Sequence, residues 1–224
     1  MLGTWTNVAT VVAGSLIGMA IGNRLPERIR QVVFTGLGLM TLGIGVSMVI
    51  RGTRPLIIIT SIVLGAVIGE VINIERQLER FAGWLQTRVK VGGDTFIRGF
   101  VTASLLFCVG PMTIVGSIQD GLTGDSTILV TKGIMDGFGS VALAATTGVG
   151  VLFAAVTVLV VQGVLTLLGK SLAVLAEPEA LNQLTGVGGL LIIGLAIRML
   201  EIKDIRVGNL LPALLIVAVL VVLV

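Results

Sequence analysis

Long apolar runs separated by short polar segments dominate the pattern of the chain. Each run is about as long as the 17–25 residues that a helix needs to cross the hydrocarbon core of a bilayer. The pattern therefore predicts an all-α fold, a polytopic transmembrane helix bundle with about eight spans. The link at 148–150 is so short that the fifth and sixth spans could be divided differently. The predicted spans are 5–22, 32–50, 55–73, 96–118, 128–147, 150–168, 186–200 and 208–224.

One segment between the third and fourth spans is too polar to cross a membrane. Within 74–90, apolar residues recur at helical spacing with charged residues between them. This pattern predicts an amphipathic helix that lies in the membrane interface, with Trp84 as its headgroup anchor. An ordinary cytoplasmic helix packed on the protein is the alternative.

Two distant parts of the chain resemble each other. Leu-Pro-Glu and Thr-Gly-Leu-Gly occur within 25–38, and Glu-Pro-Glu and Thr-Gly-Val-Gly occur within 177–188. Pro55 and Pro212 open matching apolar runs. Spans one to three would then match spans six to eight, and an offset of five spans inverts the repeat, as in many secondary transporters. The predicted single membrane domain (1–224) has repeat 1 in 1–73, an interfacial amphipathic helix in 74–95, a central hairpin in 96–147 and repeat 2 in 148–224.

Composition agrees with a membrane location. The chain is 55% hydrophobic and 12% charged, whereas a soluble domain has about 25% charged residues. The net charge of +3 does not indicate a nucleic-acid partner, because the positive residues sit in short loops between apolar runs. They concentrate in the first, third and seventh loops. The positive-inside rule therefore predicts a bacterial inner-membrane protein with both termini outside.

The fourth span contains a helix-breaking pair, Gly110-Pro111. Proline cannot donate a hydrogen bond to the carbonyl of Phe107, so we expect a break or kink at mid-membrane depth. The second half-helix would begin at Pro111, and its positive dipole end suits an anion, whereas the freed carbonyls suit a cation. A kink that only shapes packing is the alternative. The small polar neighbours that make a binding site plausible are Ser104, Cys108, Thr113 and Ser117.

The fifth span carries two charged residues, Lys132 and Asp136, four positions apart on one helical face. Charges inside a membrane are costly and mark functional sites by default. We expect Asp136 to face the break and to bind a proton or monovalent cation, with Lys132 as its counter-charge and Ser140 one turn further along. A pair near the outer surface that neutralises itself and does nothing else is the alternative.

Several other functions find no support. The chain has no histidine and one cysteine, and no nucleophile–base set or ligand set for a transition metal is visible, so we expect no enzyme, no cofactor and no metal centre. Asp125 or Ser126 is expected to cap the next helix, since the sequence around them does not match the Gly-x-Gly-Asp motif of intramembrane aspartyl proteases. Glycines spaced by four, including Gly14 and Gly18, predict close helix packing, and Asn7 in the first span predicts an interhelical hydrogen bond.

The run from Phe100 to Asp125, followed by Lys132 and Asp136-Gly137, resembles the YdfK/YqgA-like membrane proteins of bacteria, the family of domain of unknown function 554 (DUF554). Asn7, followed by glycines at 14, 18 and 22, is also similar, so the resemblance covers nearly the whole chain. It implies a multi-span inner-membrane protein and no particular substrate.

We therefore predict a secondary transporter of a small polar or anionic solute, coupled to a cation or proton. An ion channel and a non-transporting scaffold or sensor are the alternatives. The expected partners are the lipid bilayer and a small solute or ion, and a homodimer is an open possibility for a membrane protein of this size.

Overall fold

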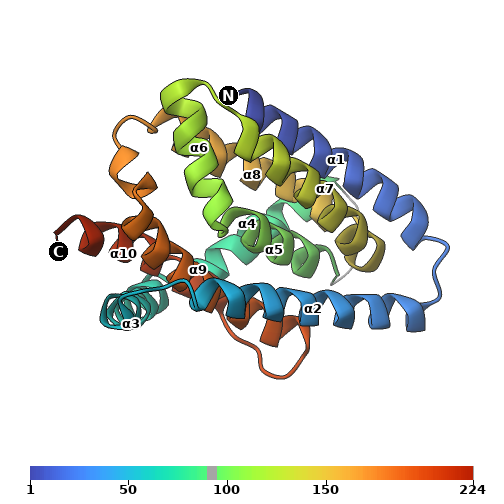
Figure 1. Cartoon of the computed structure of the whole chain (residues 1–224). Coiled ribbons are helices and arrows are strands. Elements are labelled where there is room, and N and C mark those ends of the chain that lie inside the picture. Colours follow the sequence, from blue (N-terminus) through green and yellow to red (C-terminus); the bar gives the residue numbers. More distant parts are fainter. Residues whose placement is uncertain (90–94, 224) are drawn as a thin grey trace.

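The computed structural model describes residues 1–89 and 95–223. Within that part of the chain, every regular element is helical, which confirms the predicted all-α class. The elements are α1 (Leu2–Gly22), α2 (Glu27–Val49), α3 (Pro55–Ile72), α4 (Ile74–Val89), α5 (Thr95–Cys108), α6 (Pro111–Thr123), α7 (Thr127–Thr147), α8 (Gly150–Leu167), η1 (Ala173–Ala176), α9 (Pro178–Met199), η2 (Val207–Leu210) and α10 (Pro212–Leu223) (Figure 1).

The described helices fit a multi-span membrane protein. Six of them, namely α1, α2, α3, α7, α8 and α9, are long and apolar enough to cross a membrane. The pair α5 and α6 passes the same test only when taken together, and it is bent by 60° at the break. The C-terminal segment Val207–Leu223 is a shorter apolar helix.

Some helix boundaries differ from the prediction. The second and seventh spans were expected at 32–50 and 186–200, but α2 begins at Glu27 and α9 begins at Pro178. Each helix extends through a polar first turn that hydropathy does not mark as apolar. The fifth and sixth spans divide at Gly148, whose φ of +79° is readily adopted by glycine.

Asp125 caps the start of α7. Its Oδ1 accepts hydrogen bonds from the Thr127 hydroxyl at 2.6 Å and from the Thr127 backbone N–H at 3.0 Å. These bonds, chiefly the one from the hydroxyl, hold the pKa of the exposed Asp125 carboxyl below its ordinary value. The capping role predicted for Asp125 or Ser126 therefore falls to Asp125.

Helix α4 is tied to the protein at its N-terminal end. Glu75 is buried, and its carboxylate pairs with Arg198 and accepts a hydrogen bond from the Gly208 N–H at 2.6 Å. The Glu75 N–H donates to Asn209 Oδ1 at 2.7 Å. Trp84 further along α4 is exposed. The interfacial position of this helix stays a prediction, and residues 90–94 of the predicted segment lie outside the described residues.

Helices α1 and α7 pack closely side by side (Figure 1). A Cβ atom added to Gly14 would lie 2.2 Å from the carbonyl oxygen of Gly137, and one added to Gly18 would lie 2.3 Å from the carbonyl oxygen of Val141. The absence of side chains at these positions lets the two backbones meet, as the glycine spacing predicted.

Contacts between connections group the helix ends into two faces. On one face, Arg54 pairs with Glu179 at 2.6 Å, and Gly121 at the end of α6 packs against the connection after α8. On the other face, Arg30 donates to the carbonyl oxygen of Ala145 at 3.1 Å, and Arg98 pairs with Glu201 at 2.9 Å. The α5–α6 pair therefore starts on one face and ends on the other.

Replacing Gly14 with alanine should lower the free energy of unfolding by about 1–3 kcal/mol, because the new methyl group overlaps rigid backbone of α7. Gly43→Ala is the matched control, since a Cβ there meets nothing within 4 Å. Denaturant titration of both variants in detergent, followed by circular dichroism, makes the comparison. Equal stability of the two variants would contradict the close α1–α7 packing.

Candidate functional site

The helix break lies where the sequence predicted it. Helix α5 ends at Cys108, Gly110 is extended with φ −72° and ψ 150°, and α6 begins at Pro111. The Thr113 hydroxyl donates to the carbonyl oxygen of Phe107 at 2.9 Å, the group that Pro111 leaves without its helical donor. The break is therefore stabilised from within the chain, which buried backbone at membrane depth requires.

A buried charged pair lies on α7. Lys132 and Asp136 form an ion pair through Asp136 Oδ2, and both side chains are buried. The amide Nδ2 of Asn7, on α1, donates to the same carboxylate oxygen at 2.9 Å. The charges of the pair compensate each other, and the amide adds a hydrogen bond that a buried carboxylate needs.

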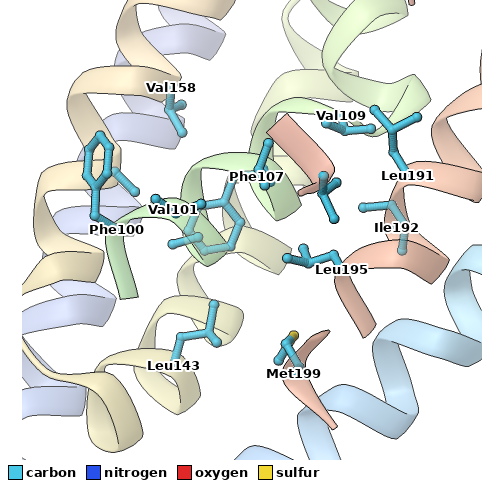
Figure 2. Packing of buried hydrophobic residues seen from close by; sticks show 14 of the residues in the cluster. Phe100, Val101, Phe107, Val109, Leu143, Val158, Leu191, Ile192, Leu195 and Met199 are labelled. Atoms are coloured by element: carbon cyan, nitrogen blue, oxygen red, sulfur yellow. The ribbon is translucent and has the colours of Figure 1, made fainter. Parts of the chain in front are cut away.

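The pair and the break share a cavity of about 350 Å³, which is walled by α2, α7, α9 and the α5–α6 break. Gly110, Pro111, Lys132 and Asp136 all line it. The volume falls within the range of about 300–1,000 Å³ typical of small-molecule sites. Figure 2 shows apolar lining residues that come from α5, α7 and α9, namely Phe107, Leu143, Ile192 and Met199.

The other predicted site residues have different surroundings. Ser104 donates to the Thr157 hydroxyl at 3.0 Å and so faces α8, and Ser140 donates to the backbone carbonyl of Asp136 at 2.7 Å. Thr113 stabilises the break, Ser117 is buried, and Cys108 is half-buried. None of these five residues is among those that line the cavity.

Sequence reasoning missed three parts of this site. Asn7 was expected to make an interhelical hydrogen bond, which the structure has, but its partner is the Asp136 carboxylate. Arg51 follows α2 and lines the cavity. The third part is a set of methionines, since five of the seven methionine side chains in the chain line the same cavity. These are Met40, Met48, Met112, Met135 and Met199.

A second cavity lies on the face where α9 ends. It has a volume of about 600 Å³, and its lining includes Arg98, Arg198, Glu201 and Asp204. Met199, which is buried, lines both this cavity and the one at the ion pair. A single side chain therefore belongs to the wall of both spaces.

The described residues contain no group of three His, Cys, Asp or Glu side chains that could hold a metal ion. Asp136 is the carboxylate expected to take a proton or monovalent cation. The ammonium group of Lys132 already contacts it, so an added cation has to compete with that contact. A proton can add to the carboxylate without taking the place of Lys132.

Fold and site together define a multi-pass helical membrane protein in which a buried ion pair lines a cavity at a broken helix. Its sequence relationships agree with this class. The chain belongs to the family described as "Protein of unknown function (DUF554)", whose model matches residues 2–222, so the resemblance noted from the sequence is confirmed.

Two relatives cover almost the whole chain. One is the "Uncharacterized membrane protein YdfK" of Bacillus subtilis (strain 168), 30% identical over 220 residues that make up 96% of this chain and 93% of the relative. The other is the "Uncharacterized protein YqgA" of Escherichia coli (strain K12), 31% identical over 220 residues that make up 96% and 94% of the two chains. No solved structure matches the chain.

Replacing Thr113 with valine should lower the free energy of unfolding by about 1–3 kcal/mol, because the buried carbonyl of Phe107 loses its donor. Thr131→Val is the matched control, since the Thr131 hydroxyl makes only an exposed bond to a carbonyl of its own helix. Thermal unfolding of the two variants in the same detergent provides the test. A Thr113→Val protein as stable as the control would show that the break does not depend on this bond.

Proposed function

We propose that the chain is a secondary transporter of a small organic anion, coupled to a proton that Asp136 takes up. One observation carries the proposal: the buried Lys132 lines a cavity and also pairs with the buried carboxylate of Asp136. The proposal involves transport alone and no enzymatic step.

The coupling between anion and proton follows from the balance of charge in the cavity. When Lys132 pairs with Asp136, the pair is neutral, and an anion that enters the cavity places a second negative charge beside one ammonium group. Two carboxylates that share one cation repel each other in a site of low dielectric constant. A proton on Asp136 removes one of the negative charges and frees Lys132 for the anion. Anion and proton therefore favour each other, and this coupling is reciprocal.

The surroundings of Asp136 also suit its protonated form. A protonated carboxyl group donates one hydrogen bond. The Oδ1 atom of Asn7 belongs to the amide that already contacts Asp136, and it has no hydrogen-bond partner among the described residues. That oxygen is an available acceptor for the new proton. Two further ionisable side chains among the described residues lie at the site: Arg51 lines the cavity, and Cys108 ends α5 at the break.

Helix pairing supports an inverted repeat. The repeat predicted from the sequence matches α1 with α8, α2 with α9 and α3 with α10, and in each case the two matched helices pack against each other. A two-fold axis that passes between matched helices would produce such contacts, and repeats related by such an axis are common in transporters. The six long apolar helices, the bent pair and the C-terminal helix would then be the eight predicted spans.

The grouping of helix ends supports an orientation in a bacterial inner membrane. One face gathers the connections after α1, α3, α7 and α9, and arginines lie in or beside those after α1, α3 and α9. The positive-inside rule would put this face in the cytoplasm and both chain ends outside. The 600 Å³ cavity would then be the cytoplasmic vestibule, with Met199 between it and the binding cavity.

Anion binding should strengthen as the pH falls through the range in which Asp136 takes up a proton. With small carboxylates at fixed concentration, thermal stabilisation of the purified protein should be larger at low pH than at high pH, because bound ligand stabilises the folded state by mass action. The affinity difference should be about 5- to 150-fold, the usual size of coupling between two sites. Asp136→Asn should bind the anion with little pH dependence, and Lys132→Gln should bind it weakly at every pH.

Sodium, potassium and choline salts form the control series, because a monovalent cation at Asp136 would make stabilisation depend on the cation and not on pH. Uptake into proteoliposomes then tests transport itself. Saturable uptake driven by an inward proton gradient supports the proposal, and single-channel currents through reconstituted protein would contradict it. If no small anion stabilises the wild-type protein at any pH, the site is not an anion site.

A further inference from the structure

The cavity at the ion pair is apolar over most of its surface. Beyond Lys132, Asp136 and Arg51, its side chains are mainly aliphatic, aromatic or thioether groups. The five methionines among them have flexible, polarisable side chains that adapt to irregular apolar ligands. A site that binds only a small, fully hydrated anion does not need an apolar lining of this kind. The lining instead suits a ligand that carries an apolar tail.

The cavity also reaches the flank of the molecule between α2 and α7. Met40 on α2 and Met135 on α7 both line it, yet they are 64% and 58% exposed. Both residues lie inside long apolar helices. Large apolar neighbours that do not line the cavity, Leu39 and Ile134, are exposed on the same flank helices. In a multi-span membrane protein, a flank of this composition faces lipid, so the mouth of the cavity opens toward the bilayer.

Charge at the cavity favours an anionic head group on that ligand. Two cationic side chains, Lys132 and Arg51, stand against one carboxylate, Asp136. The start of α6 at Pro111 adds the positive end of a helix dipole to the same wall. Lys132 is buried and Arg51 is exposed, so the cationic part of the lining runs from the interior of the site to the end of α2.

We propose that the substrate is a single-tailed amphipathic anion, such as a medium-chain carboxylate, which enters from the bilayer between α2 and α7. The head group binds at Lys132, and the tail lies against the methionine-lined wall. This inference rests on the proposed function, and it adds the substrate class and the direction of entry. It does not follow from anion transport, since a short carboxylate would satisfy Lys132 equally well.

Chain length is the first test. Binding of acetate, butanoate, hexanoate and octanoate is measured by thermal shift on protein in lipid nanodiscs, with octanol as the neutral ligand of matched length. Affinity should rise about fourfold for each added CH2 group, the change expected when a methylene leaves water for an apolar site. Octanol should bind more weakly than octanoate, and Lys132→Gln should remove the difference between them.

The entry route is tested by narrowing the mouth. Met135→Trp places a large side chain in the lining at the flank, and Ile134→Trp is the matched control on the neighbouring exposed position outside the lining. The association rate of octanoate should fall about tenfold or more in Met135→Trp and stay unchanged in Ile134→Trp. Retained acetate binding in Met135→Trp shows that the variant is folded and that Lys132 is intact.

Four results would overturn the inference. Equal binding of acetate and octanoate, still dependent on pH and Lys132, would leave the proposed transporter standing with a polar substrate. A normal association rate of octanoate in Met135→Trp would place the entrance elsewhere. A change of oligomeric state in both tryptophan variants, seen by light scattering, would show that the flank is covered by a second copy. Absence of binding by every carboxylate would remove the proposed function together with this inference.

Discussion

The buried ion pair between Lys132 and Asp136 is the interaction on which the site depends. A charge inside an apolar helix is costly unless a partner compensates it. Here the partner lies one turn away on α7, and Asn7 on α1 supplies a further hydrogen bond. That bond requires α1 to lie close against α7, which the glycines at 14 and 18 permit. The hydrogen bonding of the ion pair therefore depends on the close packing of α1 on α7.

The break at Gly110-Pro111 gives the pair its cavity. The α5–α6 pair is bent by 60°, and the cavity lies between this bend and helices α2, α7 and α9. The Thr113 hydroxyl keeps the bend stable because it bonds the carbonyl that proline frees. Secondary transporters with inverted repeats commonly place their sites at broken helices near the membrane midplane. Met199 lies at the junction of the two cavities, where alternating access would require a movable barrier.

The sequence predicted the parts of this arrangement that depend on local spacing. The break follows from Gly110-Pro111, the ion pair follows from charges four residues apart, and the helical class follows from long apolar runs. It could not predict that Asn7, 129 positions away, donates a hydrogen bond to Asp136, because no local pattern marks which helix α7 will contact. An asparagine in an apolar span was the available signal, and it indicated a hydrogen bond without its partner.

The residues that line the cavity could not be predicted from the sequence either. Methionines at 40, 48, 112, 135 and 199 are far apart in the chain and gather only when α2, α6, α7 and α9 assemble. Conversely, Ser104 looked like a site residue because it is close to the break in sequence. On a helix, its direction depends on rotation about the axis, and it points to Thr157 on α8. Proximity in sequence thus identified the region of the site but not its lining.

The most direct test of the account is whether binding of an anion takes up a proton. Calorimetric titration of the wild-type protein with a carboxylate, repeated in buffers with different enthalpies of ionisation, measures the protons exchanged on binding. The account predicts net proton uptake in the wild-type protein and none in Asp136→Asn, with the anion still bound in both. Binding of the anion to the wild-type protein without proton uptake would contradict the claim that Asp136 and the anion compete for Lys132.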